Sequence, residues 1–338
     1  MKPFTYSRSA SVQAAVAAAE QAHDLKFLGG GTNLVDLMRE DIEQPDTLLD
    51  ITAVPFSEIS VRSDGGLSIG AGARNSAVAA HPSVRANYPM LSEAILCGAS
   101  AQIRNMATVG GNLMQRTRCL YFYDRASRCN KRHPGSGCDA IEGFTRMHAI
   151  LGTSNACIAA HPSDMCVALA ALDAIVHVHG PSGERSIAFT DFHRLPGKMP
   201  ERDNNLQQAE IITAVELPPK GFAKNYSYLK IRDRLSYAFA LVSAAVGLEL
   251  DGDTIKEARF ALGGVAHKPW RDPRAEAALQ GQPANAATFA RAADVLLRDA
   301  RGYEHNSFKI DLARRCLVRA LTQAARGTPQ SQSSKKIA

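Results

Sequence analysis

Two glycine-rich turns are the first feature of this sequence with evident chemistry. The turn Gly29-Gly30-Gly31-Thr32-Asn33 follows an apolar run and precedes a helical pattern, and Thr108-Val109-Gly110-Gly111-Asn112 has the same character. Glycines let backbone N–H groups approach a phosphate closely, and a helix N-terminus favours negative charge. Because the two turns lie about 80 residues apart, the pair favours one large ligand with two ends, such as a dinucleotide.

Each turn also has a simpler interpretation. The first matches neither the Gly-x-Gly-x-x-Gly fingerprint nor the phosphate loop that ends in Gly-Lys-Ser/Thr, so it is also typical of a tight strand-to-helix turn. The second is also typical of a glycine pair in a hairpin or bulge. The two turns together therefore support a nucleotide site better than either does alone.

A group of cysteines is the second feature with evident chemistry. The chain has seven, and Cys119, Cys129, Cys138 and Cys157 lie in or next to a stretch rich in Arg, Gly and Pro. We expect residues 116–148 to form an irregular inserted loop, which four thiolates around a metal would hold in order. Their spacing lacks the short Cys-x-x-Cys of ferredoxins and zinc ribbons. The spacing alone thus leaves a [4Fe–4S] cluster, a structural zinc, and free or disulfide-bonded thiols open.

The other three cysteines fit apolar helical patterns. Cys97, Cys166 and Cys316 are therefore expected to be core thiols. The number of cysteines is odd, and no apolar stretch of signal-peptide length follows Met1. Neither observation suggests a disulfide framework.

Length and composition limit the class of protein. The 338 residues suggest two domains, and 45% hydrophobic with 21% charged residues excludes disorder, collagen or coiled coil for the whole chain. No apolar run is long enough to span a membrane. The net charge is +6, and the basic residues are dispersed apart from a dense stretch between Arg116 and Arg146. The chain has no basic stripe with regularly interleaved aromatic residues, which disfavours nucleic acid as a partner.

The elements that must position the turns alternate between strand and helix. A short apolar strand over 25–28 leads into the first turn, and a helix over 34–40 leaves it. The second half predicts a sheet followed by helices, after a linker at 218–221. The expected strands are 47–51, 59–61, 67–69, 175–178 and 211–215, and the expected helices are 12–22, 92–96, 164–174, 286–299 and 306–325. Residues 226–230, 238–250 and 257–262 are expected to be strands or strand–helix pieces.

The order of four motifs resembles a known family. Gly-Gly-Gly-Thr-Asn, Thr-Val-Gly-Gly-Asn, Pro162-Ser163-Asp164 and Tyr228-Leu229-Lys230 are similar to the FAD-binding medium subunits of the molybdenum hydroxylases, which include carbon monoxide dehydrogenase, xanthine dehydrogenase and aldehyde oxidoreductases. The resemblance implies an α+β fold. A vanillyl-alcohol-oxidase-type FAD-binding domain in two lobes would cover 1–218, a C-terminal sheet-and-helix flavoprotein domain would cover 224–326, and 327–338 would be a disordered tail.

The resemblance also implies which residues bind FAD. Asp164 would lie on the adenosine side, Ile212 would make an apolar contact, and Lys230 would lie near the flavin ring. Without the motif, Asp164 is also typical of a helix N-cap and Lys230 of a solvated strand lysine. The remaining implied FAD residues are Lys26, Phe27, Leu28, Gly29, Gly30, Gly31, Thr32, Asn33, Leu34, Thr108, Gly111 and Asn112.

Within this family the chain resembles the flavin subunits of periplasmic aldehyde oxidoreductases, whose insert holds a [4Fe–4S] cluster. This resemblance implies that an insert over about 116–157 binds the cluster through Cys119, Cys129, Cys138 and Cys157. The surrounding Arg and Lys side chains fit such an anionic cluster.

The implied activity is electron transfer, with no residue of this chain converting the substrate. A large molybdenum-cofactor subunit would oxidise an aldehyde, and a small [2Fe–2S] subunit would pass electrons to FAD here. Tyr237-Ala238-Phe239-Ala240 replaces the Asp-Phe-Ala of many relatives, which favours a ferredoxin or quinone-like external acceptor over NAD.

Two other functions and two locations stay open from the sequence. A stand-alone flavin oxidoreductase with a structural zinc loop is the main alternative, and a non-enzymatic basic binding module is the next. We expect the periplasm, reached by co-translocation with a signal-bearing partner, slightly ahead of the cytoplasm.

Overall fold

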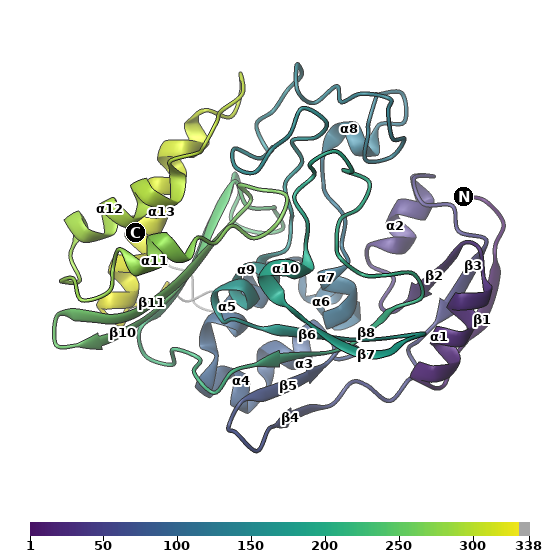
Figure 1. The fold of residues 1–338 in the computed structure, drawn as a ribbon, viewed down its shortest axis with the longest axis horizontal. Coiled ribbons are helices and arrows are strands. Elements are labelled where there is room, and N and C mark those ends of the chain that lie inside the picture. Colours follow the sequence, from purple (N-terminus) through teal and green to yellow (C-terminus); the bar gives the residue numbers. More distant parts are fainter. Residues whose placement is uncertain (331–338) are drawn as a thin grey trace.

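The fold contains three separate sheets with helices packed between and around them. The computed structural model describes residues 1–330, and Figure 1 shows the sheets following one another from the N-terminal part to the C-terminal part. The expected α+β class is confirmed. Of the tail predicted to be disordered, residues 331–338 lie outside the described part of the chain.

The N-terminal lobe is a parallel sheet in the order β1-β3-β2. The Ser11 hydroxyl caps the first helix by accepting a hydrogen bond from the Ala14 N–H, and the helix buries Ala15, Val16 and Ala19. Strand β2 ends immediately before the first glycine-rich turn, and α2 begins immediately after it. The elements of this lobe are β1 (Thr5–Arg8), α1 (Val12–Gln21), β2 (Leu25–Leu28), α2 (Leu34–Arg39) and β3 (Thr47–Asp50).

The middle of the molecule is an antiparallel sheet in the order β4-β5-β8-β6-β7. Helix α9 is buried along its whole length in the core cluster that also holds residues of this sheet, and it packs on α5 and on the C-terminal sheet. Helices α3, α4 and α6 and strand β7 are not predicted from the pattern, because they are short and weakly periodic. The strands are β4 (Ile59–Val61), β5 (Leu67–Gly70), β6 (Ile175–Gly180), β7 (Gly183–Ala188) and β8 (Ile211–Leu217), and the helices are α3 (Asn75–Ala80), α4 (Pro82–Asn87), α5 (Pro89–Cys97), α6 (Ala101–Met106), α7 (Val109–Leu113), α9 (Asp164–Ala171) and α10 (Phe189–Phe192).

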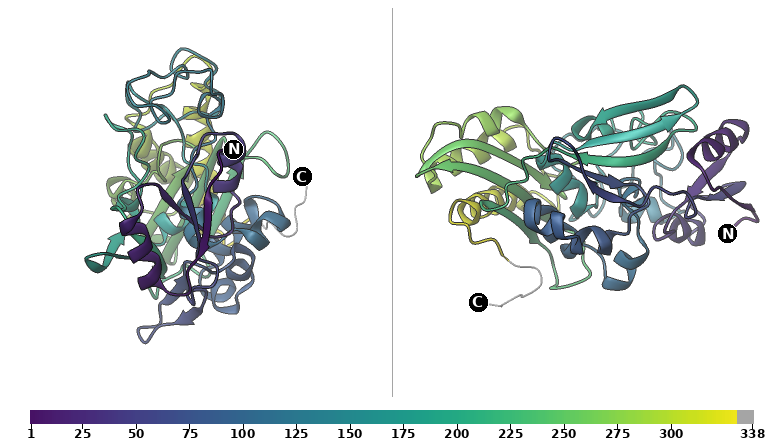
Figure 2. Two further views of the ribbon diagram at one scale, coloured as in Figure 1. Left: turned by 90° about the vertical axis from the view of Figure 1, so that its right-hand side faces the viewer. Right: turned by 90° about the horizontal axis from the view of Figure 1, so that it is seen from below.

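The C-terminal part is an antiparallel sheet in the order β11-β10-β9 with helices packed on it. Figure 2 shows this part and the N-terminal lobe at opposite ends of an elongated molecule. A turn at Asp251-Gly252-Asp253 joins its two long strands. The elements are β9 (Tyr226–Ile231), β10 (Val242–Asp251), β11 (Thr254–Gly263), α11 (Pro273–Ala277), α12 (Ala286–Leu297) and α13 (Phe308–Ala325).

The segment over 116–148 is irregular, as expected, apart from the short helix α8 (Leu120–Tyr123). In Figure 1 it lies between α2 and the C-terminal helices. No helix within residues 1–330 is long and apolar enough to cross a membrane.

The C-terminal core offers a direct stability test. Phe289 on α12 is 1% exposed and packs in the cluster that joins this helix to the sheet and α13. Phe289→Ala should lower the free energy of unfolding by about 3–5 kcal/mol, because the variant loses the burial of the ring and leaves a cavity. Urea unfolding measures this; a loss below about 1 kcal/mol would show that the ring is not packed as described.

Candidate cofactor-binding site

The two glycine-rich turns lie against each other. A Cβ atom added at Gly29 would stand 3.0 Å from Thr108 Oγ1, and one added at Gly30 would stand 2.0 Å from the Met106 carbonyl oxygen. Gly30 therefore has no room for any side chain, because it faces backbone that cannot move aside. This close packing brings residues from positions about 80 apart in the sequence to one place.

The second turn begins a helix and is not a hairpin. Thr108 caps α7, and its hydroxyl accepts a hydrogen bond of 3.1 Å from the Gly111 N–H. The first turn leads into α2 without a side-chain cap. Both turns thus carry a strand or extended segment into a short helix, the arrangement expected of a phosphate-facing backbone.

Two cavities of about 620 Å³ each meet at these turns. Thr32, Asn33 and Gly111 line both cavities. The shared wall makes one elongated site with two ends, which suits a dinucleotide whose pyrophosphate lies at the glycines. The predicted residues that line only the first cavity are Lys26, Phe27, Gly29, Gly30, Gly31, Leu34, Thr108 and Ile212, and those that line only the second are Asn112, Asp164 and Lys230. Leu28 lines neither cavity.

Asp164 and Lys230 form a buried ion pair in the second cavity. Lys230 Nζ lies 2.7 Å from Asp164 Oδ2, and the two side chains are 2% and 6% exposed. Tyr228 donates a hydrogen bond of 2.6 Å to Asp164 Oδ1, and burial raises the pKa of Tyr228 well above its ordinary value. Lys230 also donates to the Cys97 carbonyl at 3.1 Å.

This pair corrects two sequence-based interpretations. Asp164 and Lys230 touch, so the predictions that Asp164 lies on the adenosine side and Lys230 near the flavin ring do not both fit one extended dinucleotide. The cap of α9 is Ser163 rather than Asp164, and its hydroxyl accepts from the Cys166 N–H. Lys230 is not a solvated strand lysine.

The mouth of the second cavity carries the Tyr237-Ala238-Phe239-Ala240 segment. Phe239 lines the cavity, and the Arg118 guanidinium lies 5.4 Å from the centre of its ring. Tyr237 also lines it and is 57% exposed. Aromatic side chains therefore border this end of the site where they meet solvent.

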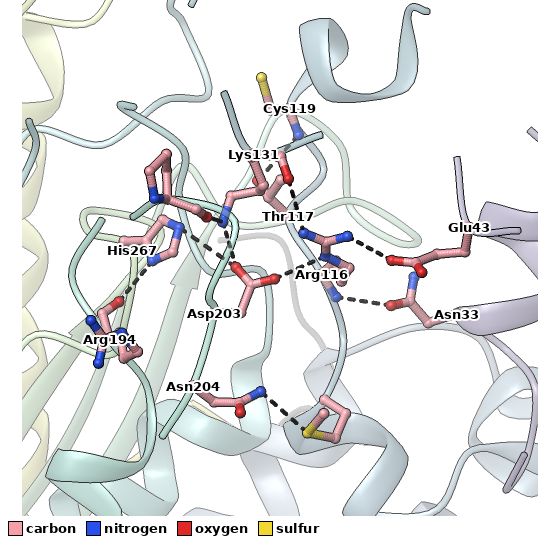
Figure 3. A network of polar contacts seen from close by, with 12 residues as sticks. Asn33, Glu43, Arg116, Thr117, Cys119, Lys131, Arg194, Asp203, Asn204 and His267 are labelled. Atoms are coloured by element: carbon pink, nitrogen blue, oxygen red, sulfur yellow. Dashed lines mark hydrogen bonds and ion pairs between the residues drawn. The ribbon is translucent and has the colours of Figure 1, made fainter. Parts of the chain in front are cut away.

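A buried network of charges joins the first turn to the cysteine loop, as Figure 3 shows. The Arg116 N–H donates to Asn33 Oδ1 at 2.8 Å, and its guanidinium bonds Glu43 at 2.6 Å and Asp203 at 2.9 Å. Lys131, whose side chain is 1% exposed, bonds the other oxygen of Asp203 at 2.5 Å. Arg116 therefore links the glycine turn to the segment that begins the insert.

Asp203 gives this network a pH dependence. Burial alone would raise the pKa of Asp203, but Lys131 and Arg116 outweigh burial and hold it well below its ordinary value. At pH values above about 3.9, the pKa of an Asp in the unfolded chain, the ionised Asp203 therefore stabilises the folded chain. This stabilisation is lost as the pH falls below that value.

Asp203→Asn is therefore expected to lower the free energy of unfolding by about 3–5 kcal/mol at pH 7, because it leaves the buried Lys131 without its counter-ion and Arg116 with Glu43 alone. The difference in the free energy of unfolding between the variant and the natural chain should stay constant above pH 5 and become smaller below about pH 4. Denaturant unfolding across pH measures it. If this difference in the free energy of unfolding grew as the pH was lowered, the low pKa of Asp203 in the folded chain would be contradicted.

The four predicted cysteine ligands line one small cavity. Cys119, Cys129, Cys138 and Cys157 all face it, with Lys131 at its wall. Burial raises the pKa of Cys119 to about 12 and that of Cys157 to about 11. These groups are neutral thiols as they stand, so a metal centre would have to displace their protons.

The spacing of the thiols bears on what they can hold. Around a tetrahedral zinc with bonds of about 2.3 Å, sulfurs lie about 3.8 Å apart. Within residues 1–330, ligand atoms of His, Cys, Asp or Glu come within 4.8 Å of one another in a group of three at His161, Cys166 and His193. The four thiols form no such group in that part of the chain, so no three of their sulfurs lie within 4.8 Å of one another.

The group formed by His161, Cys166 and His193 does not suit a metal. The Ser163 N–H donates to His161 Nδ1 at 3.3 Å, so the proton of this neutral ring is on Nε2 and no lone pair is free there.

Cys166 is fully buried in α9, as expected for a core thiol, and Cys97 and Cys316 are buried as well.

The basic side chains of the insert are largely paired. Acidic residues outside the Cys119–Cys157 loop hold several of them, so these cations fasten the insert to its surroundings rather than giving it a free positive field. The pairs are Arg116 with Glu43 and Asp203, Arg118 with Asp36, Arg125 with Asp41, Arg128 with Asp139, Lys131 with Asp203, and Arg146 with Asp233.

Family models match nearly the whole chain. The "FAD binding domain in molybdopterin dehydrogenase" matches residues 2–220, and the "CO dehydrogenase flavoprotein C-terminal domain" matches residues 226–324. The fold and the two-ended cavity therefore define an FAD-binding subunit. The chain belongs to the FAD-binding medium subunits of the molybdenum hydroxylase family.

Individual relatives agree with this. The chain is 50% identical over 325 residues to the aldehyde oxidoreductase FAD-binding subunit PaoB of Escherichia coli, covering 96% of this chain and 99% of the relative. The structure is similar to carbon monoxide dehydrogenase from Hydrogenophaga pseudoflava, with a TM-score of 0.76, 25% identity and coverage of 97% and 99%. Quinoline 2-oxidoreductase from Pseudomonas putida 86 gives a TM-score of 0.74, 26% identity and coverage of 96% and 98%.

Proposed function

We propose that this chain is the FAD- and [4Fe–4S]-binding electron-transfer subunit of a molybdenum-dependent aldehyde oxidoreductase. One observation carries the proposal: a two-ended dinucleotide cavity and a four-thiol cavity lie next to each other, joined by the short segment from Arg116 to Cys119. The FAD-binding unit would be 1–218, with the insert over 116–157, and the flavoprotein-like C-terminal unit would be 224–326.

FAD is placed across both cavities. The pyrophosphate lies at Gly29–Asn33 and Thr108–Asn112, and the adenosine lies in the first cavity, where Phe27 and Ile212 supply apolar walls. The flavin ring lies in the second cavity, where Lys230 and Asp164 line the wall. Bound FAD supplies reversible two-electron and one-electron chemistry.

Lys230 and Asp164 orient the ring and fix the charge next to it. The carboxylate accepts bonds from Tyr228 and Lys230, so it is held in one position. With FAD bound, the Lys230 ammonium would supply positive charge next to the ring, balanced in part by the Asp164 carboxylate that it contacts.

The cluster is placed on Cys119, Cys129, Cys138 and Cys157. The cavity shared by the four thiols supports one metal centre, and because no three of the sulfurs lie within 4.8 Å of one another in residues 1–330, a larger iron–sulfur cluster suits them better than a single zinc ion. A bound cluster supplies one-electron transfer close to the flavin cradle, and it also orders the loop.

The partners follow from the family and the relatives. The PaoB relative is named as an FAD-binding subunit of an aldehyde oxidoreductase. A large molybdenum-cofactor subunit oxidises the aldehyde, a small [2Fe–2S] subunit transfers the electrons, and an external acceptor such as a ferredoxin or quinone-like molecule receives them. The complex assembles around its cofactors and reaches the periplasm with a signal-bearing partner, with a cytoplasmic complex as the alternative.

A reduction experiment tests this function. In the purified three-subunit complex, an aldehyde added without oxygen should bleach the flavin band, while the same aldehyde should leave the isolated chain oxidised. Dithionite, which reduces both samples, is the control. Bleaching of the isolated chain by aldehyde would instead support a stand-alone flavin oxidoreductase.

A further inference from the structure

His148 lies at the edge of the four-thiol cavity without being one of its predicted ligands. Its Nε2 stands 3.1 Å from Cys119 Sγ, and the residue is only 3% exposed. The Tyr121 ring lies beside it, with ring centres 6.0 Å apart. No other predicted cysteine ligand has a comparable side-chain contact among the described hydrogen bonds of residues 1–330.

The C-terminal part of the chain holds His148 in place. The Lys309 ammonium donates to the His148 carbonyl at 2.8 Å, and the Asn306 amide donates to it at 3.2 Å. The His148 N–H donates to the Thr145 carbonyl at 2.8 Å. Lys309 and Asn306 are both fully buried, so the backbone that carries the imidazole is fixed from two sides.

The surroundings of the ring indicate which nitrogen carries its proton. His148 Nδ1 is buried and has no hydrogen-bond partner. A neutral imidazole carries one N–H, and an unpaired buried acceptor is tolerated better than an unpaired buried donor. A Cys119 thiolate has no proton and can only accept a hydrogen bond. An Nε2–H of His148 directed at this sulfur therefore gives both the donor and the acceptor a partner.

We propose that His148 donates an Nε2–H hydrogen bond to the Cys119 thiolate of the bound cluster and raises the reduction potential of that cluster. The inference rests on the [4Fe–4S] assignment proposed above. A donor to a ligating sulfur withdraws electron density, which stabilises the reduced cluster because that state carries one more negative charge. His148 is thus a positioning and tuning residue, not a ligand.

Two variants of similar size separate the hydrogen bond from packing. His148→Gln keeps an N–H donor, whereas His148→Met has none. The full chain is purified without oxygen, its iron is counted, and the midpoint potential of the cluster is measured by redox titration followed by electron paramagnetic resonance. His133→Met, on an exposed residue of the same loop, is the control.

The expected result is a potential clearly more negative in His148→Met than in His148→Gln, with His133→Met unchanged. Equal potentials in iron-loaded Gln and Met variants would overturn the role of His148 while leaving the cluster in place. Loss of the cluster from the Met variant alone supports the N–H···S bond, whereas its equal loss from both variants overturns it. A natural chain that holds no iron would overturn the cluster itself, and this inference with it.

Discussion

Gly30→Val protein is expected to fold without FAD. The new Cβ would lie 2.0 Å from the Met106 carbonyl oxygen and 2.7 Å from its carbon. The first turn must then move away from the second, so the wall shared by the two cavities separates. Flavin content, measured by absorbance after acid release, should fall from one per chain to almost none.

A graded control accompanies this variant. Gly29→Ala brings its Cβ to 3.0 Å from the Thr108 hydroxyl, a side chain that can rotate, so it should keep FAD with weaker affinity. Urea unfolding shows whether the C-terminal core remains intact in both proteins. Stoichiometric FAD in Gly30→Val would show that the turns do not form the cradle.

Cys129→Ser is expected to lower the iron content from four per chain to nearly zero. Cys129 is one of the four cysteines that line the thiol cavity, and its backbone pairs antiparallel with that of Cys138. A serine hydroxyl is a poor ligand for this cluster. FAD should remain largely bound, because Arg116 keeps its bonds to Asn33, Glu43 and Asp203 outside the loop.

Two further variants make this result specific. Cys166→Ala removes a buried core thiol and should keep its iron. Arg116→Met removes the link between the glycine turn and the insert, so it should lower both iron and FAD. Full iron in Cys129→Ser would contradict the ligand assignment, and FAD lost together with iron would show that the cradle depends on the cluster.

The sequence predicts those parts of the fold whose signal is local. The helix over 12–22 has a cap and an apolar stripe, and the strand over 25–28 ends at three glycines, so their positions agree closely with α1 and β2. The helices α3, α4 and α6 are six residues each. Such short segments depend on tertiary packing more than on their own periodicity, so the pattern does not reveal them.

The candidate site divides in the same way. The glycine turns and the four cysteines are visible in the sequence, and the structure brings each set together. The pairing of Asp164 with Lys230, or of Asp203 with Arg116, joins residues more than 60 positions apart. The sequence around a charged loop residue does not indicate which residue it will pair with. The roles of Asp203 and His148 are therefore visible only in the folded structure.

Cofactor content of the natural chain tests the central claim most directly. The chain is purified without oxygen, and its visible spectrum is recorded before and after acid release of flavin and iron, with zinc measured in parallel. We predict one FAD and four iron atoms per chain, with flavin bands above a broad iron–sulfur absorption that disappears on acidification. One zinc per chain without iron, or a colourless protein, would contradict it.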